Sequence, residues 1–182
     1  MKKVVGIVGG MGPEATSLLY QFIIENVEAK TDQEHIHILI DSNPEIPDRT
    51  ASIKMNSVEP LLKMADSANR LVKAGAELIA IPCNTAHSPI IMNQVRKFIE
   101  MNGLDLVLMN IVEETYRWVK ENVAGRKIVL YATAGTYYSG VYQQFFDPDG
   151  DYQIVEPDED DRTLIWEAIY NVPDEEIWST RM

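Results

Sequence analysis

The sequence has one cysteine, Cys83, and only three histidines. A single thiol excludes an internal disulfide and a metal site built from several cysteines. No apolar run approaches the roughly 18 residues that a membrane-spanning helix needs. Basic residues are also scarce, because 16 Lys and Arg stand against 28 Asp and Glu and give a net charge of −12. A surface of that charge repels phosphate backbones and anionic lipids, so we expect neither nucleic acid nor a membrane as a partner.

The first residues, Met1-Lys2-Lys3 followed by valines, look at first like the start of a signal peptide. Glycines soon interrupt the apolar stretch, and a helix without a small-residue cleavage site follows. We therefore expect a cytoplasmic protein. A chain of 182 residues can bury one sizeable core, or two small lobes that share an interface.

Apolar runs alternate with helical periods along the whole chain. Strands are predicted at 4–8, 36–40, 78–81, 106–108, 128–132 and 152–155. Helices are predicted at 13–27, 61–75, 86–101, 112–123, 138–146 and 160–170, with a loop over 42–53. Strands that alternate with helices form right-handed crossovers and a parallel sheet. The expected fold class is α/β, with two Rossmann-like parallel-sheet lobes and helices on both faces. The first lobe would cover 1–102 and the second 103–182.

A glycine-rich turn follows the first predicted strand. Residues 10–15, GMGPEA, fit the dinucleotide-binding pattern G-x-G-x-x-[GA]. That pattern is accompanied by an acidic residue about 20 positions further on, which holds a ribose. Here the acid that closes the second apolar run is Asp41, which lies further away. The turn therefore favours a close approach of the backbone to a carboxylate over the binding of a pyrophosphate.

Cys83 lies where the third predicted strand gives way to a helix. A thiol at a helix N-terminus is favoured as the thiolate, because unpaired N–H groups carry partial positive charge. The alternative is a buried cysteine without chemistry. Asn84 and Thr85 add polar groups beside the thiol. His87 either pairs with the thiol as a base or caps its own helix.

Two further loops carry polar groups at the same end of the predicted sheets. Arg49 is a planar, two-pronged donor suited to a carboxylate, although it would also suit a surface ion pair with Asp48 or Glu45. Residues 133–140 combine hydroxyl side chains with glycines ahead of a helix, which is typical of an anion cradle and also of ordinary helix caps. Ligands of parallel sheets bind beyond the carboxyl ends of the strands. We therefore expect the loops 9–12, 41–53, 82–88 and 132–140 to converge on a small anionic ligand.

Four segments, GGMGPEAT, NPEIPDRTA, PCNTAH and ATAGTYYSGVY, resemble the aspartate/glutamate racemase family, and most closely its microbial aspartate racemases. The resemblance covers about residues 3–170. It implies a two-lobed α/β protein that acts on a small acidic amino acid, aspartate or glutamate, without pyridoxal phosphate or any other cofactor or metal. Members of the family are commonly dimers, so a homodimer is expected.

The resemblance also assigns roles to residues of this chain. In the family, two cysteines, one from each lobe, face each other across the substrate, and Cys83 corresponds to one of them. Arg49 corresponds to the arginine that binds the substrate carboxylate. Near residue 162 the family has a lysine for the distal carboxylate, and Arg162 is the nearest substitute here. Other positions expected to line the pocket are Met11, Asn84, Thr85 and Thr136.

The chain also departs from the family pattern. The second cysteine of the family lies beyond the last residue of this chain, and no cysteine follows Cys83. We therefore expect a C-terminally truncated, incomplete second lobe and impaired racemisation. Two other functions remain open, a non-catalytic dicarboxylate-binding protein and a single-cysteine decarboxylase or isomerase. Loss of α-deuterium from aspartate without racemisation would indicate a single functional thiol.

Overall fold

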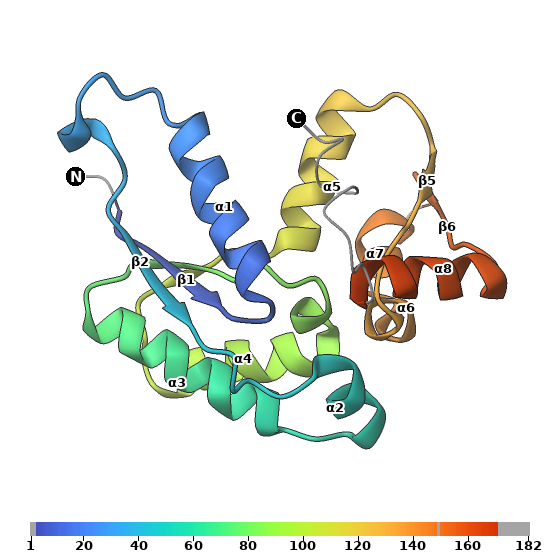
Figure 1. The fold of residues 1–182 in the computed structure, drawn as a ribbon, viewed down its shortest axis with the longest axis horizontal. Helices are drawn as coiled ribbons and strands as arrows, with labels where there is room; N and C mark the ends of the chain where they lie inside the picture. Colours follow the sequence, from blue (N-terminus) through green and yellow to red (C-terminus); the bar gives the residue numbers. More distant parts are fainter. Residues whose placement is uncertain (1–2, 149, 171–182) are drawn as a thin grey trace.

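The computed structural model describes residues 3–148 and 150–170. Figure 1 shows two groups of helices and strands, joined by the segment that leads into α5. In chain order the elements are β1 (Val5–Gly9), α1 (Pro13–Asn26), η1 (Asp32–Glu34), β2 (Ile38–Ser42), α2 (Arg49–Met55), α3 (Glu59–Lys73), β3 (Leu78–Ala80), η2 (Thr85–His87), α4 (Pro89–Met101), β4 (Val107–Leu108), α5 (Ile111–Asn122), β5 (Lys127–Val129), α6 (Ala134–Ser139), α7 (Val141–Phe146), β6 (Gln153–Val155) and α8 (Glu159–Tyr170).

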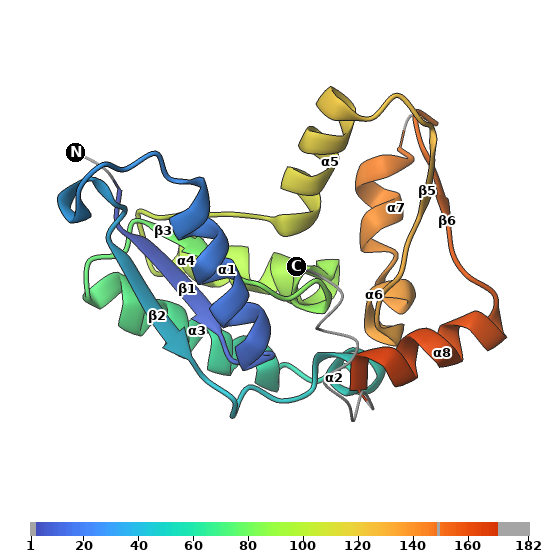
Figure 2. The ribbon, with the colours of Figure 1, turned by 45° about the horizontal axis from the view of Figure 1, so that its top comes forward.

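The larger sheet is wholly parallel and has the strand order β2-β1-β3-β4. Its register pairs Val5 with Ile38 on one side and with Leu78 on the other. Helices α3 and α4 cover one face and α1 lies on the opposite face (Figures 1 and 2). This group is called the first lobe below. The parallel sheet with helices on both faces confirms the predicted fold class.

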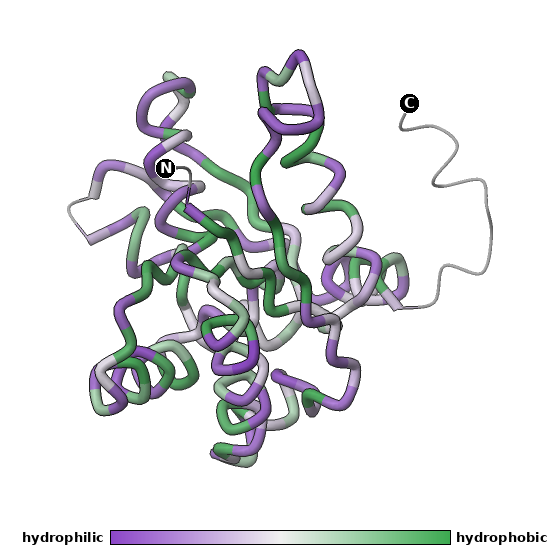
Figure 3. The backbone as a smooth tube through the Cα atoms, turned by 90° about the vertical axis from the view of Figure 1, so that its left-hand side faces the viewer, coloured by the Kyte–Doolittle hydropathy of each residue, from purple (hydrophilic) through white to green (hydrophobic). Residues whose placement is uncertain are grey.

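The core of the first lobe lies between the sheet and the helices α3 and α4. Ile79 of β3 and Met64 of α3 are each 1 % exposed, and the residues of this core form one cluster. Figure 3 shows hydrophobic strands in the middle of the molecule and mixed hydrophobic and hydrophilic turns along the helices. The opposite face is covered less well. Leu18 and Phe22 of α1 are 43 % and 51 % exposed.

A second parallel sheet pairs β5 with β6, and with α5, α6 and α7 it forms the second lobe. Its core is largely aromatic. Phe146 is 1 % exposed and meets Tyr116 edge to face, with ring centroids 5.3 Å apart. Tyr152 meets the same ring at 5.9 Å. Such pairs stabilise a core beyond the apolar area that they bury.

Residues 106–108 were predicted within the second lobe, and β4 pairs with β3 in the first sheet. The division of the chain at residue 102 remains a prediction. Two other predictions about elements were wrong in detail. The 42–53 loop contains α2, whose N-cap Asp48 accepts a hydrogen bond from the Ala51 backbone at 2.6 Å. The helix predicted over 138–146 is two helices, because Gly140 between them has a left-handed φ of 58°.

Candidate functional site

The four loops predicted to converge do so. Arg49 Nη2 donates to the Met11 carbonyl at 3.2 Å, which joins the second loop to the glycine turn. Thr85 Oγ1 lies 2.9 Å from Thr133 Oγ1, which joins the Cys83 loop to the fourth loop. The carboxyl ends of parallel strands all point to one edge of a sheet, so their loops meet there. The contact between Thr85 and Thr133 also ties the first lobe to the second.

Arg49 is held by backbone carbonyls and keeps part of its hydrogen-bonding capacity free. Nη1 donates to the carbonyls of Ile46 at 3.2 Å and Pro47 at 2.9 Å. Together with the bond to Met11, these contacts use three of the five N–H groups of a guanidinium. Nε is buried and has no hydrogen-bond partner. The free Nε–H and the remaining Nη2–H belong to adjacent nitrogens, the arrangement that binds a carboxylate through two bonds.

This environment separates the two alternatives for Arg49. A surface ion pair with Asp48 or Glu45 would place a carboxylate against the guanidinium. Instead, Asp48 caps α2 and Glu45 pairs with Lys63 at 3.5 Å. A cation surrounded by carbonyl oxygens, with a buried unpartnered donor, is suited to an anion that comes from outside the chain.

Cys83 is a half-buried free thiol at the end of the chain segment that leaves β3. Cys83 was predicted to lie at the N-terminus of a long helix, but it does not directly precede one. The short 3-10 helix η2 comes first, and α4 begins at Pro89. The Cys83 backbone is fixed at both of its polar groups, because its N–H donates to Ile81 at 2.8 Å and its carbonyl accepts from His87 Nδ1 at 2.8 Å.

His87 takes part in the backbone structure rather than in a pair with the thiol. It is 1 % exposed, and its other ring nitrogen, Nε2, faces the Met109 carbonyl at 3.4 Å. The imidazole therefore links the Cys83 loop to the residue after β4. Burial lowers the pKa of His87 below its ordinary 6.5, with a smaller contribution from Arg96, against two backbone carbonyls that raise it.

The lowered pKa of His87 predicts a pH dependence of stability. Between the folded-state pKa and 6.5 the unfolded chain binds more protons, so the free energy of unfolding falls as the pH drops below about 6.5. The slope for this one group approaches about 1.4 kcal/mol per pH unit. Urea unfolding at pH 7.5 and 5.5 measures it. His87→Asn keeps a donor for the Cys83 carbonyl but does not titrate, so its smaller slope identifies the histidine. Equal slopes in both proteins would contradict the prediction.

Three threonine hydroxyls form a partly buried triangle between the lobes. Thr85 Oγ1 lies 3.1 Å from Thr136 Oγ1, and Thr133 Oγ1 lies 3.4 Å from the same atom. Thr85 and Thr136 are 6 % and 1 % exposed. Each hydroxyl supplies one proton, so the triangle can satisfy itself. Two of the predicted pocket residues, Thr85 and Thr136, therefore lie together, and their hydroxyls bond to one another.

Because Gly135 has no side chain, α6 packs closely against Thr85 of this triangle and against Thr50, which follows Arg49. A Cβ on Gly135 would lie 2.5 Å from Thr50 Oγ1 and 2.6 Å from Thr85 Cγ2. We expect Gly135→Ala to lower the free energy of unfolding by about 1 to 3 kcal/mol, because short, packed side chains have little room to move. Gly125→Ala is the control, since its Cβ would meet only Val123 Cγ1, at 3.9 Å. Equal urea midpoints for the two variants would contradict this prediction.

Tyr170, the last residue of α8, is subject to the charges of Asp48, Arg49 and Cys83. Burial raises the pKa of its phenol, Asp48 and Cys83 raise it further, and Arg49 lowers it. All three groups therefore lie within electrostatic range of one hydroxyl. Figures 1 and 2 both show this end of α8 beside α2. Sequence reasoning missed Tyr170, because an aromatic residue at a helix end carries no signal of its own.

Arg162 lies away from these contacts. Its Nη2 pairs with Glu156 Oε2 at 2.6 Å, its Nε donates to the Pro157 carbonyl at 2.8 Å, and its guanidinium lies 4.6 Å from the centre of the Tyr137 ring. No contact in the described part of the chain joins it to Arg49 or Cys83. Its predicted role with a distal carboxylate would require it to leave these partners.

Residues 8–176 match the family model described as Asp/Glu/Hydantoin racemase. The chain belongs to this family. It is 29 % identical over 150 residues to the broad specificity amino-acid racemase RacX of Bacillus subtilis (strain 168), an alignment that covers 80 % of this chain. That alignment spans 61 % of the length of the curated relative.

Two solved structures of racemase relatives resemble the fold. The Picrophilus torridus aspartate racemase is 27 % identical with a TM-score of 0.74, over 93 % of this chain and 74 % of that one. An aspartate racemase homologue from Pyrococcus horikoshii OT3 is 23 % identical with a TM-score of 0.71, over 93 % of this chain and 71 % of that one. The second likeness concerns the fold alone. The resemblance drawn from the sequence motifs is thereby confirmed at the level of the family.

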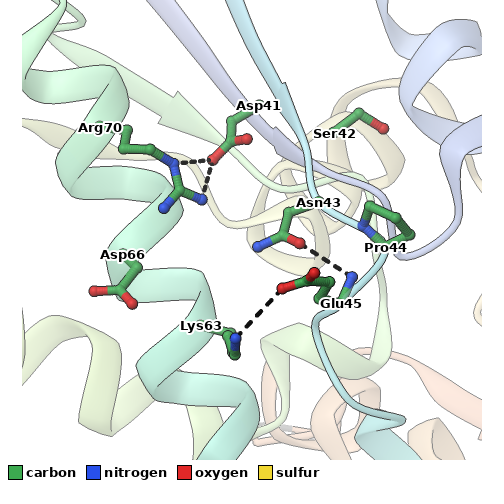
Figure 4. Close-up of a pocket in the computed structure, with 8 residues that line it drawn as sticks. All are labelled: Asp41, Ser42, Asn43, Pro44, Glu45, Lys63, Asp66 and Arg70. Atoms are coloured by element: carbon green, nitrogen blue, oxygen red, sulfur yellow. Dashed lines mark hydrogen bonds and ion pairs between the residues drawn. The ribbon is translucent and has the colours of Figure 1, made fainter.

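A cavity of about 330 Å³ lies between the first residues of the 41–53 loop and helix α3. Figure 4 shows its charged side chains, and two pairs of them bond to each other. Arg70 binds Asp41 Oδ2 through Nε at 3.0 Å and Nη2 at 2.7 Å, and Lys63 pairs with Glu45. Neither Cys83 nor Arg49 lines this cavity. It is lined by Asp41, Ser42, Asn43, Pro44, Glu45, Lys63, Asp66 and Arg70.

Within residues 3–148 and 150–170, no group of three or more His, Cys, Asp or Glu side chains is placed to hold a metal ion. Over the same residues, no helix has the length and hydropathy needed to cross a membrane. The expectations of a cofactor-free, cytoplasmic protein remain predictions.

Proposed function

We propose that this chain carries the substrate-binding and proton-transfer site of a pyridoxal-phosphate-independent amino-acid racemase. Cys83 transfers the α-proton of the substrate, and Arg49 binds the carboxylate of an acidic amino acid, aspartate or glutamate. The observation that carries the proposal is the buried, unpartnered Nε of Arg49. Membership of the racemase family supports it.

The chemistry follows from the weak acidity of an α-hydrogen next to a carboxylate. Removing that proton requires a positioned base and stabilisation of the negative charge that develops on the carboxylate oxygens. A thiolate at Cys83 is the base. Arg49 provides fixed positive charge, and its three carbonyl contacts hold the guanidinium in place before a substrate binds. Little reorganisation is then needed as the charge develops.

The stereochemical result depends on which face receives the returning proton. Cys83 is the single thiol of the 182 residues. Return of a proton from the same thiol restores the original configuration, whereas inversion requires an acid on the opposite face. The chain by itself is therefore expected to exchange the α-proton faster than it inverts the α-carbon.

A single experiment tests the proposal. The purified chain is incubated with L-aspartate in deuterium oxide, and the α-proton signal is followed by NMR while chiral chromatography follows D-aspartate. We expect loss of the α-proton signal together with slower formation of D-aspartate. The single cysteine favours a second candidate, a dicarboxylate-binding protein without catalysis. Stabilisation by aspartate without any exchange would support that candidate and exclude the proton transfer.

A further inference from the structure

Tyr142 makes a hydrogen bond across the two lobes to the residue that follows Cys83. Its hydroxyl donates to Asn84 Oδ1 at 2.7 Å. The Tyr142 ring stacks on Phe146 in the second-lobe core, with centroids 5.8 Å apart and an interplanar angle of 30°. Burial raises the pKa of Tyr142, so the phenol keeps its proton at neutral pH and remains a donor.

In this structure the oxygen end of the Asn84 amide faces the phenol of Tyr142 in the second lobe. An amide carries an acceptor oxygen at one end and two N–H donors at the other. Because the oxygen accepts from Tyr142, the nitrogen is turned away from it. In the described part of the chain no group accepts a hydrogen bond from Asn84 Nδ2, and Asn84 is exposed. Two free donors therefore lie one residue from the thiol of Cys83.

We infer that Tyr142 is a positioning residue, which holds Asn84 with its N–H donors toward an anionic oxygen of the substrate. The inference rests on the proposed function, since the site must take an anion. Without the phenol the amide can turn over, and its oxygen then faces the substrate carboxylate and repels it. Tyr142 thus favours the orientation in which the Asn84 amide donates to the substrate, although Tyr142 itself does not contact the substrate.

The test separates this role from a general contribution to packing. Tyr142→Phe removes the hydroxyl and keeps the stacked ring. We expect L-aspartate to bind about five- to tenfold more weakly by calorimetry, the effect of one lost hydrogen bond. In an Asn84→Ala background the same change should have no further effect, because the two residues act through one contact. Tyr152→Phe is the matched control, since its ring contacts Phe146 and it makes no bond to Asn84.

Unchanged affinity in Tyr142→Phe, or additive losses in the double variant, would overturn the inference. If the unaltered chain binds no aspartate, the proposed function fails. The positioning of Asn84 by Tyr142 is then tested by a measurement that needs no ligand. The ¹⁵N relaxation of the Asn84 side-chain amide reports its order. We expect lower order in Tyr142→Phe than in the unaltered chain and in Tyr152→Phe. Equal order in all three proteins would overturn the positioning role.

Discussion

Arg49→Ala is expected to remove the stabilisation of this protein by L-aspartate and to weaken binding by about 2 to 5 kcal/mol, the range for deleting one partner of a buried charge pair. The free Nε–H and Nη2–H of Arg49 would otherwise form two charge-assisted hydrogen bonds with one carboxylate. Deleting them leaves that carboxylate without its cation. Calorimetry, and melting temperatures over a range of aspartate concentrations, measure the effect.

Two comparisons separate binding from folding. Arg49 also joins three backbone carbonyls from two loops, so Arg49→Ala should melt at a lower temperature even without ligand. The informative quantity is therefore the shift that aspartate causes. Arg49→Lys keeps the charge but not the paired donors, and an intermediate loss is expected. Arg117→Ala is the control, because Arg117 is 59 % exposed and pairs with Glu113 and Glu114 of its own helix. Equal aspartate shifts in the two alanine variants would contradict the role of Arg49.

The sequence predicted the order of strands and helices well, because apolar runs and helical periods are local properties. It failed where local signals compete. Pro44 and Pro47 indicated a loop and concealed α2, although Asp48 is a favoured N-cap residue and marks its start. The helical period across 138–146 likewise concealed the break at Gly140, where a left-handed conformation stops one helix before the next begins.

Partners that are distant in sequence were harder to predict than elements. The short strand β4 has no local sequence signal for the sheet that it joins, and it pairs with β3, a strand almost thirty residues earlier. The role of His87 was left open for the same reason, since the Met109 carbonyl that faces its ring lies in a different loop. The grouping of Arg49, Cys83 and the threonines was predicted because a general rule on parallel sheets places their loops together.

Cys83→Ser is expected to abolish exchange of the α-proton and to leave aspartate binding nearly unchanged. Serine has almost the same shape, but an alcohol is a far weaker acid than a thiol, so the base is lost. Removing a positioned base typically costs a factor of about 10² to 10⁴ in rate. The Cys83 backbone is fixed by Ile81 and His87, so the new hydroxyl should take the place of the sulfur. NMR in deuterium oxide measures the rate, and calorimetry measures the affinity.

Alkylation gives an independent test of where the thiol lies. Since Cys83 is the only cysteine, the mass of the intact chain reports its modification by iodoacetamide without ambiguity. If the substrate occupies the space between Cys83 and Arg49, aspartate should slow the alkylation of the unaltered chain. It should not slow the alkylation of Arg49→Ala at the same concentration, because that variant no longer holds the ligand. Exchange that persists in Cys83→Ser would show that the proton is transferred by a different group. Alkylation that aspartate does not slow would show that aspartate does not bind against the thiol.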